Sequence, residues 1–414
     1  MPRGVLFVHN NFPGQFRDLA QTLLARGVPC VAIGQGHAPG VEGVRLARYN
    51  LARGSTPGIL PEATRAEADL IRAKGAFGAA KALKAEGWDP AVIVVHPGWG
   101  EATYLAEVFP QARQVAFAEF WYHGRGYDVG FDTEFQAFDP DAVLRAEAKN
   151  AVMAIAYAKA DAIVAPTGFQ AASLPPAFRA RTRILHEGVD VEAIRPGPPG
   201  PFALDPENQE GGRVIAPGTP VITHVNNNME PLRGLHILAR ALPRLLAEVP
   251  GAQVLIIGKP EAQAYGGAAP GGGTWQDTCF AGVDYDPGRV HFLGRVAHQR
   301  MLAALRLGAA HVYYTYPFVL SWSLAEAMAS GCYVIGSDTA PLHDAIEDGV
   351  SGRLLPFFDV PALSAAMIAA CRDPGASMAM RAAARETAVA KFSRANGRQG
   401  WLGLLAELGV EIPG

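Results

Sequence analysis

The feature that most constrains the fold is the regular alternation of short Val- and Ile-rich runs with longer Ala- and Leu-rich stretches. The clearest runs are residues 4–10, 91–96, 162–166, 220–226, 252–258 and 333–337. Strands that are apolar along their whole length are buried on both faces, as they are in parallel sheets covered by helices. The sequence therefore predicts an α/β protein with doubly wound parallel sheets.

The length of the chain and one Pro- and Gly-rich stretch predict two domains. A chain of 414 residues is too long for one ordinary core. We expect a Rossmann-like domain at residues 1–197, a linker at 198–219, a second Rossmann-like domain at 220–395, and a C-terminal helix at 396–414 that packs locally or crosses back to the first domain. Ligands of such sheets bind outside the carboxyl ends of the strands, so loops of both domains are expected to face a central cleft.

Composition excludes several classes of protein. Apolar residues make up 49% of the chain, which argues against disorder, and the net charge of -3 gives no basic excess for nucleic acid. The four cysteines form no CxxC pair, so we expect buried thiols in a reducing compartment. The chain has no pattern of a secretory signal and no apolar run long enough to span a membrane, which predicts a cytoplasmic protein and leaves contact with a membrane surface open.

The most informative segment is residues 316–341, YPFVLSWSLAEAMASGCYVIGSDTAP. A strand ends here, a loop follows, and a helix is expected to begin near Ser321–Ser323. The free N–H groups and partial positive charge of a helix N-terminus suit a diphosphate. Glu326 lies about one turn into this helix, where it either binds a ribose diol or faces solvent, and spacing alone does not decide between these roles.

This segment resembles the signature of glycosyltransferase family 4, in which a Glu, seven residues and a second Glu precede an AMA-G-PVI pattern. Further similar segments follow in the family's order: residues 160–174, 183–197, 221–242, 290–317 and 342–359. In the first domain, residues 9–16, 96–105 and 119–132 resemble a bacterial subgroup that starts with an HNNFPGQF-type motif. The resemblance implies the GT-B fold and a retaining, metal-independent transfer of a sugar from a UDP- or GDP-sugar to a glycan, lipid or small-molecule acceptor, with no cofactor.

The resemblance also implies the residues that hold the nucleotide. Glu326 matches the family's second Glu and is expected to hold the ribose. Arg233 stands where the family usually has a Lys that grips the diphosphate, and a guanidinium serves that role too. Asn228 stands at the usual Arg position and supplies only neutral donors, while Arg295 stands where backbone groups usually contact the base.

One position departs from the family's pattern on the donor-sugar side. The first Glu of the signature falls on Phe318, which cannot accept a hydrogen bond from a sugar hydroxyl. Either backbone groups around Leu320, Ser321 and Trp322 take over that contact, or the donor specificity differs.

In the first domain, the family usually places a His at the position of Glu119, with His123 four residues further on. Glu119 is expected to stabilise positive charge on the reacting sugar, and His123 to bind a sugar hydroxyl or the leaving phosphate; the sequence leaves open which of the two faces the reacting carbon. Gly14 and Gln15 form a turn after the first strand, and His96 ends another strand, so these three residues are expected in the loops around the cleft.

Other signals leave alternatives. The long segment 259–289 is either a lid with Tyr265 or Trp275 as ligand contacts or an insertion without a ligand role. The DxD pairs at Asp139–Asp141 and Asp284–Asp286 are expected to be solvated loop acids and not metal ligands. The rival functions are a nucleotide-sugar epimerase or a phosphorylase of the same fold, or a non-catalytic nucleotide-sugar-binding protein.

Overall fold

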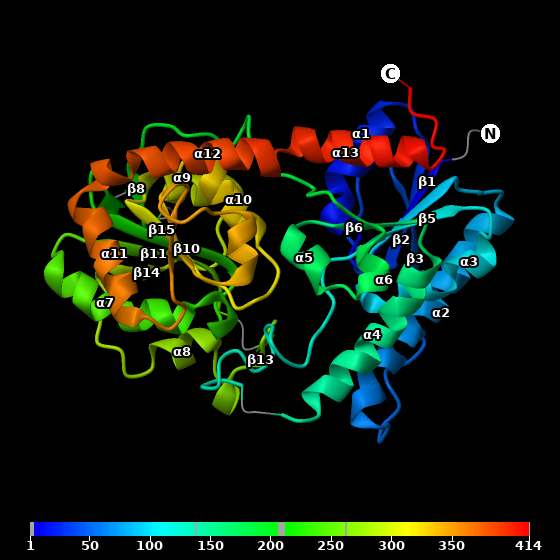
Figure 1. The fold of residues 1–414 in the computed structure, drawn as a ribbon, viewed down its shortest axis with the longest axis horizontal. Helices are drawn as coiled ribbons and strands as arrows, with labels where there is room; N and C mark the ends of the chain where they lie inside the picture. Colours follow the sequence, from blue (N-terminus) through cyan, green and yellow to red (C-terminus); the bar gives the residue numbers. More distant parts are fainter. Residues whose placement is uncertain (1–3, 137–138, 206–211, 261–262, 414) are drawn as a thin grey trace. The chain divides into compact units, whose positions relative to one another are not determined.

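The structure is a computed structural model that describes residues 4–136, 139–205, 212–260 and 263–413 (Figure 1). The chain forms two compact units, the first comprising Met1–Gly188 with Arg394–Gly414 and the second Val189–Ser393. Residues 206–211 of the expected linker and residues 261–262 of the long segment lie outside the described residues. Each unit is built around one parallel sheet, as the sequence predicts.

The first unit has a seven-stranded sheet in the order β3-β2-β1-β4-β5-β6-β7, with every neighbouring pair parallel. In the register, Val5 of β1 lies opposite Cys30 of β2 on one side and Val92 of β4 on the other. The strands are β1 (Val5–Val8), β2 (Cys30–Gln35), β3 (Arg45–Tyr49), β4 (Val92–Val95), β5 (Arg113–Phe117), β6 (Ala162–Ala165) and β7 (Thr182–Ile184).

Helices cover both faces of this sheet because alternate strand residues are apolar on both sides. Phe7 belongs to the core beneath α1 and α13, while Leu6 belongs to the core beneath α2. The helices are α1 (Arg17–Ala25), α2 (Thr64–Ala85), α3 (Leu105–Val108), α4 (Ala142–Lys159), α5 (Gly168–Ser173), α6 (Pro176–Arg179) and α13 (Arg394–Glu407), with short 3-10 turns η1 (Gly14–Phe16), η2 (Pro61–Ala63), η3 (Pro97–Trp99) and η4 (Glu101–Tyr104).

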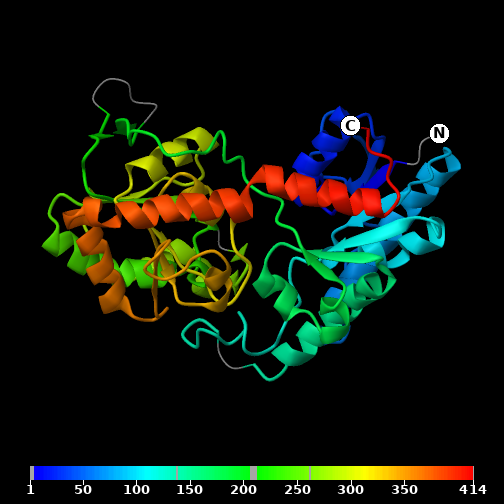
Figure 2. The same cartoon turned by 45° about the horizontal axis from the view of Figure 1, so that its top comes forward.

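The C-terminal helix α13 belongs to the first unit although it follows the second in sequence. Its Arg398 pairs with Asp18 of α1 at 2.8 Å, and its Trp401 is buried against the rings of Phe16 and Phe117. Red α13 runs alongside blue α1 in Figures 1 and 2. Apolar burial and this ion pair together attach the last residues of the chain to the first unit.

The second unit has a six-stranded sheet in the order β14-β11-β10-β15-β16-β17, again with parallel neighbours. Its strands are β10 (Val221–Asn228), β11 (Gln253–Lys259), β14 (Val290–Phe292), β15 (Ala310–Tyr313), β16 (Val334–Ser337) and β17 (Arg353–Leu355). Its helices are α7 (Leu235–Glu248), α8 (Trp275–Phe280), α9 (His298–Leu307), α10 (Trp322–Ala329), α11 (Val360–Arg372) and α12 (Met378–Phe392), with 3-10 turns η5 (Pro231–Arg233), η6 (Pro270–Gly272), η7 (Ala340–Asp344) and η8 (Pro374–Ser377).

The described part of the expected linker packs on the second unit. β8 (Phe202–Ala203) pairs antiparallel with β9 (Val214–Ile215), and Phe202 is buried in the core of this unit. The Arg300 guanidinium lies 4.5 Å from the Phe202 ring and donates to the Ala203 carbonyl oxygen at 2.7 Å. The second unit therefore begins at Val189, whereas the sequence predicts a boundary near residue 220.

The long segment 259–289 is also structured in its described residues. It contains a small antiparallel pair, β12 (Gln263–Ala264) with β13 (Gly267–Ala268), and then α8. Trp275 is buried and its Nε1–H donates to the Gly267 carbonyl oxygen at 3.0 Å, a contact that helps to hold this segment. Tyr265, the other candidate, is exposed.

The cysteines and the lengths of the apolar helices are both the subject of expectations from composition. Each of the four cysteines is a buried free thiol, as expected. Burial raises the pKa of Cys30 and of Cys332 to about 12, so neither is a nucleophile at neutral pH. Among the helices of the described residues, none is both long and apolar enough to cross a membrane.

Candidate functional site

Both sheets reverse their winding direction at the same relative place. In the first unit the reversal lies between β1 and β4, and in the second between β10 and β15. Ligands of open α/β sheets bind outside the carboxyl ends of the strands at such switch points. The residues that follow these four strands are therefore the first candidates for a site in each unit.

The first unit brings together four polar side chains at its switch point, here called the first-unit relay: His9, Gln15, His96 and Glu119. His9 follows β1, His96 follows β4 and Glu119 follows β5, so adjacent strands present them at one edge of the sheet. Gln15 Nε2 donates to Glu119 Oε1 at 3.0 Å, and His96 Nε2 donates to Glu119 Oε2 at 3.2 Å. His9 Nε2 donates to Gln15 Oε1 at 2.9 Å, which completes the chain of bonds.

Backbone N–H groups set which imidazole nitrogen carries the proton. The Asn11 N–H donates to His9 Nδ1 at 2.9 Å, and the Gly98 N–H donates to His96 Nδ1 at 3.2 Å. Each Nδ1 is therefore an acceptor, which leaves Nε2 to carry the proton and donate into the relay. Burial, reinforced by the neighbouring His96, lowers the pKa of His9 to about 3, so His9 is neutral at physiological pH.

The relay keeps Glu119 ionised. Burial by itself would raise the pKa of Glu119, but the hydrogen bond from His96, the electrostatic interaction with the imidazoles of His96 and His9, and the hydrogen bond from Gln15 together lower it below its usual value. The Glu119 backbone is held as well, because Gln170 Nε2 of α5 donates to its carbonyl oxygen at 2.6 Å. The arrangement is a carboxylate at the carboxyl end of a sheet that accepts hydrogen bonds from the side-chain N–H groups of Gln15 and His96.

Close packing around His9 requires a glycine at position 14. Gly14 has a φ of 47°, and a Cβ there would lie 2.3 Å from His9 Nε2. On the other side, the Trp99 ring packs at 4.9 Å from the His9 ring and 4.5 Å from the His96 ring. The sequence predicts Gly14, Gln15 and His96 as cleft-loop residues but misses His9. The position of His9 directly after the first strand could have identified it as a candidate.

The structure places His123 in a different contact. Its Nε2 donates to the Ser173 carbonyl oxygen at 2.9 Å, and its ring stacks on Tyr127 at 4.0 Å. Of the two residues that the sequence offers for the reacting carbon, Glu119 is thus joined to Gln15 and His96, whereas His123 is tied to α5.

In the second unit, Arg233 lies at the switch point. It ends the η5 turn after β10 and is buried, with Nη1 donating to Thr315 Oγ1 and the Val319 carbonyl oxygen at 2.9 Å each and to Tyr313 Oη at 3.3 Å. All three bonds use Nη1, so within the part of the chain that the structure describes Nη2 and Nε are left for another acceptor. Gly234, with a φ of 71°, closes the turn against Tyr314.

The helix α10 begins beside Arg233, as the sequence predicts from the signature. Ser321 caps it, since its Oγ accepts from the Ser323 N–H at 3.2 Å, and the Ser321 N–H donates to Tyr313 Oη at 2.7 Å. Tyr313 therefore contacts both Arg233 and the start of α10. Glu326, one turn further along, is 17% exposed and its Oε1 accepts from His298 Nε2 at 2.8 Å.

Phe318, which replaces the first Glu of the family's signature, is a buried residue. Its ring lies 5.8 Å from the Arg233 guanidinium and 5.9 Å from the Tyr265 ring. Leu320 packs against the core of the unit, and Trp322 is exposed. Of the backbone donors expected to replace the missing carboxylate, the Ser321 N–H is already engaged with Tyr313.

The other two predicted donor-site residues, Asn228 and Arg295, lie at the end of β10 and after β14. Asn228 ends β10, and its Oδ1 accepts from Asn227 Nδ2 at 3.4 Å. Arg295 is exposed in the loop after β14, two strands away from β10, where it lines a groove of about 630 Å³ with Tyr285 and Arg300.

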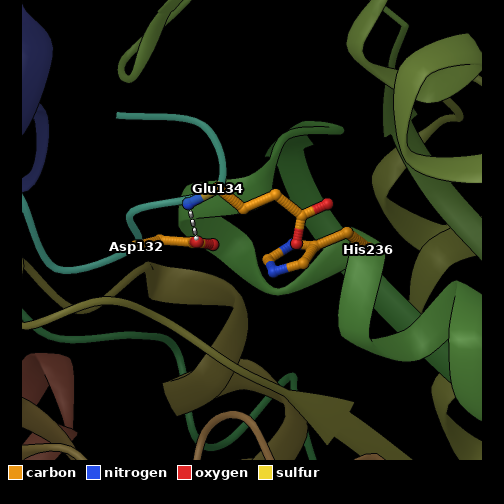
Figure 3. Close-up of side chains that lie close together, drawn as sticks. All are labelled: Asp132, Glu134 and His236. Carbon is orange, nitrogen blue, oxygen red and sulfur yellow. Dashed lines mark hydrogen bonds between the residues drawn. The ribbon is translucent and has the colours of Figure 1, made fainter. Parts of the chain in front are cut away.

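Acidic residues elsewhere take local partners. Asp139 pairs with Arg145, and Asp286 accepts from the Gly288 N–H at 2.8 Å and from Arg289 at 3.0 Å. In the loop before α4, Asp132 Oδ1 accepts from the Glu134 N–H at 3.0 Å, the dashed contact of Figure 3. These are turn and ion-pair interactions of the kind that loop acids commonly make.

Comparison with known families identifies the class. Residues 26–194 match the model described as the glycosyl transferase family 4 group, and residues 219–373 match the model described as glycosyl transferases group 1. Two Rossmann-like units with these matches define a chain of the GT-B fold, both units of which match glycosyltransferase family models. The chain belongs to glycosyltransferase family 4.

Sequence relatives carry related names over part of their length. The chain is 30% identical over 193 residues to the phosphatidyl-myo-inositol mannosyltransferase of Mycolicibacterium smegmatis, covering 46% of this chain and 42% of that protein. It is 30% identical over 217 residues to the D-inositol 3-phosphate glycosyltransferase of Mycobacterium marinum, covering 50% and 42%. The chain thus spans less than half the length of the curated relatives it matches.

Solved structures show the same fold at low identity. The sucrose-phosphate synthase of Thermosynechococcus elongatus superposes with a TM-score of 0.73 at 18% identity, covering 98% of this chain and 99% of that one. Anabaena HepE in complex with UDP and glucose superposes with a TM-score of 0.64 at 14% identity, covering 98% and 100%. At these identities the likeness supports the GT-B fold itself.

Proposed function

We propose that this protein is a retaining, metal-independent glycosyltransferase that moves a sugar from a UDP- or GDP-sugar to a glycan, lipid or small-molecule acceptor. The observation that carries the proposal is Arg233, a buried guanidinium with two nitrogens available beside the N-terminus of α10. The complex of HepE with UDP and glucose, and the names of the mannosyltransferase and inositol glycosyltransferase relatives, support a nucleotide-sugar donor.

On the donor side, Arg233 and α10 act on the diphosphate. As the glycosidic bond breaks, negative charge grows on the leaving phosphate, and fixed positive groups aimed there stabilise the transition state more than the ground state. Arg233 is pre-positioned by Thr315 and the Val319 carbonyl, so little reorganisation is needed during the reaction. A guanidinium and a helix N-terminus supply the positive charge that a metal ion supplies in other transferases.

In the first unit, Glu119 is the residue proposed to act on the sugar. Loss of the leaving group places positive charge on the reacting carbon and ring oxygen, and an ionised carboxylate near them lowers the barrier. The His96 and Gln15 donors hold both oxygens of Glu119 in place. Retention of configuration is part of the proposal and is supported by membership of the family; the role of His123 on a sugar hydroxyl or phosphate stays a prediction.

The residues at the donor-sugar position support a specificity different from that of family members with a Glu there. Phe318 and Tyr265 offer C–H surface where a carboxylate would accept a hydroxyl hydrogen bond. Asn228 adds only neutral donors, so Arg233 contributes most of the binding energy for the diphosphate. The cytoplasmic location and contact with a membrane surface remain predictions.

The experiment that tests the proposal measures unfolding temperature and nucleotide release. UDP, GDP, ADP and dTDP are each added with and without EDTA. One of them is expected to raise the unfolding temperature by the same amount under the two conditions. At 100 times its dissociation constant, this ligand should add about 2.7 kcal/mol to the free energy of unfolding. The corresponding nucleotide sugar should then release that diphosphate only when an acceptor is present. Stabilisation only with added metal would contradict the metal-independent mechanism. Donor binding without turnover on any acceptor would favour a binding protein, and product formation without acceptor an epimerase.

A further inference from the structure

His298 contacts the residue proposed to bind the ribose. Its Nε2 donates to Glu326 Oε1 at 2.8 Å, and it comes from the first residue of α9, whereas Glu326 comes from the second turn of α10. The Glu326 side chain is 17% exposed and the His298 side chain 52% exposed. The bond therefore lies at the surface of the unit, where a ligand can reach the carboxylate.

Folding stability does not account for this contact. Ion pairs with an exposed partner contribute little to stability, and a basic side chain gains nothing from the dipole at a helix N-terminus. α9 is held instead by its apolar face, which buries Leu302 and Leu305 in the core of the second unit. The position of His298 therefore calls for an explanation other than holding α9 in place.

The contact restricts Glu326 in a way that suits recognition of a diol. A glutamate side chain has three rotatable bonds, and ordering them lowers the affinity of any ligand that depends on the carboxylate. An ionised carboxylate has about four acceptor positions, and the two hydroxyl groups of a diol occupy two of them. A donor on one oxygen orders the side chain before the ligand arrives.

We propose that His298 is a positioning residue for nucleotide recognition, which holds the Glu326 carboxylate in the orientation that accepts the two ribose hydroxyls. This inference rests on the proposed function, because it assigns the ribose to Glu326. It adds a residue that is not part of the motif by which Glu326 was found. The expected signature is a loss of discrimination for the ribose hydroxyls, without a loss of diphosphate binding.

The chain offers a matched control for the substitution. His343 Nε2 donates to Asp338 Oδ1 at 2.7 Å in the same unit, and its side chain is 58% exposed. Neither His343 nor Asp338 belongs to the proposed site. His343→Ala therefore removes an equivalent surface pair, while His298→Gln keeps a side-chain N–H donor at the position under test.

The experiment compares, by calorimetry on the full chain, the nucleoside diphosphate that stabilises the protein with its 2′,3′-dideoxy analogue. The ribose form is expected to bind the wild type and His343→Ala about tenfold or more tightly than the analogue. In His298→Ala, the diphosphate should bind at most about threefold more tightly than the analogue, while the affinity for the analogue stays unchanged. His298→Gln should keep most of the wild-type difference between the two affinities.

The outcomes separate this inference from the proposed function. If His298→Ala keeps the wild-type ratio between its affinities for the diphosphate and for the dideoxy analogue, the positioning role is overturned and the proposed function stands. An equal loss of affinity for both ligands has the same meaning. If the wild type binds the diphosphate and its dideoxy analogue equally tightly, both the ribose contact of Glu326 and the role of His298 are overturned. If no diphosphate binds at all, the proposed function fails, and the inference with it.

Discussion

The two units have the same strand order around their switch points but place opposite charges there. The first unit holds an ionised carboxylate, Glu119, between the side-chain N–H donors of Gln15 and His96. The second holds a guanidinium, Arg233, beside a helix N-terminus. Since the backbone topology is shared, it determines where a ligand can bind, and the side chains at the strand ends determine which charge that ligand meets.

The two sites also differ in what holds them. The first-unit relay consists of side chains bonded to one another across three strands, so displacing one member shifts the next. Arg233 is held mainly by acceptors of one neighbouring segment, Thr315 and Val319. We therefore expect nucleoside diphosphate affinity to depend on the second site, and turnover to depend on both sites, through Glu119 and through the charge that Arg233 places near the leaving phosphate.

The largest effect is expected from Glu119→Gln. This substitution removes the charge opposite the reacting carbon while keeping the shape of the side chain, so kcat should fall by about 100- to 1,000-fold. Affinity for the nucleoside diphosphate should stay within about twofold, because the second unit is untouched. Steady-state kinetics and calorimetry on the same variant check both statements.

Glu407→Gln is the control for that substitution. Glu407 is an exposed acid of the same unit that pairs with Arg183, away from the relay. Its variant should keep the wild-type kcat. A Glu119→Gln enzyme with near-normal kcat would break the division of labour between the sites, and so would one that loses nucleotide affinity as strongly as turnover.

An intermediate effect is expected from Arg233→Gln. The diphosphate loses a charge-assisted contact, so nucleoside diphosphate affinity should fall by about 10- to 100-fold, while affinity for the bare nucleoside changes little. Arg244→Gln, on the exposed side of α7, is the control and should change neither. Calorimetric titration with both ligands measures the difference, and equal losses for the two would refute the phosphate role.

The smallest effect is expected from Gly14→Ala compared with Gly27→Ala. Both positions have positive φ, so both variants should lose about 1–2 kcal/mol of unfolding free energy. Only at Gly14 does the new Cβ meet His9, at 2.3 Å, whereas nothing lies within 4 Å at Gly27. Gly14→Ala should therefore also lose about tenfold in kcat, as the relay shifts. The same kcat in the two variants would show that the position of His9 does not matter to the chemistry.

Much of the fold could be predicted because its signals are local. Apolar runs between helical stretches indicated the two parallel sheets, and the signature around Ser321 and Glu326 indicated a helix start at the end of β15. Arg233 was predicted from the family resemblance, because it stands where the family usually has a Lys. Each of these depends on residues that are neighbours in sequence, where propensity and capping act.

Other assignments depended on contacts between residues far apart in the chain. The Pro- and Gly-rich stretch looked like a free linker, yet Phe202 is buried in the second unit through Arg300, nearly a hundred residues later. The indole N–H of Trp275 donates to the carbonyl oxygen of Gly267, within the long segment 259–289. Composition cannot reveal either contact, because burial is a property of the folded chain.

The sequence by itself determined the class of protein and the two parallel sheets that its local patterns imply, and its family resemblance predicted Arg233 and Glu326 as donor-site residues. Only the tertiary structure decided that Glu119 is joined to His96 and Gln15 while His123 is tied to Ser173, and that His298 contacts Glu326. The reason is physical: hydrogen-bond partners and shifted pKa values depend on distances across strands and helices, which packing sets and no spacing along the chain encodes.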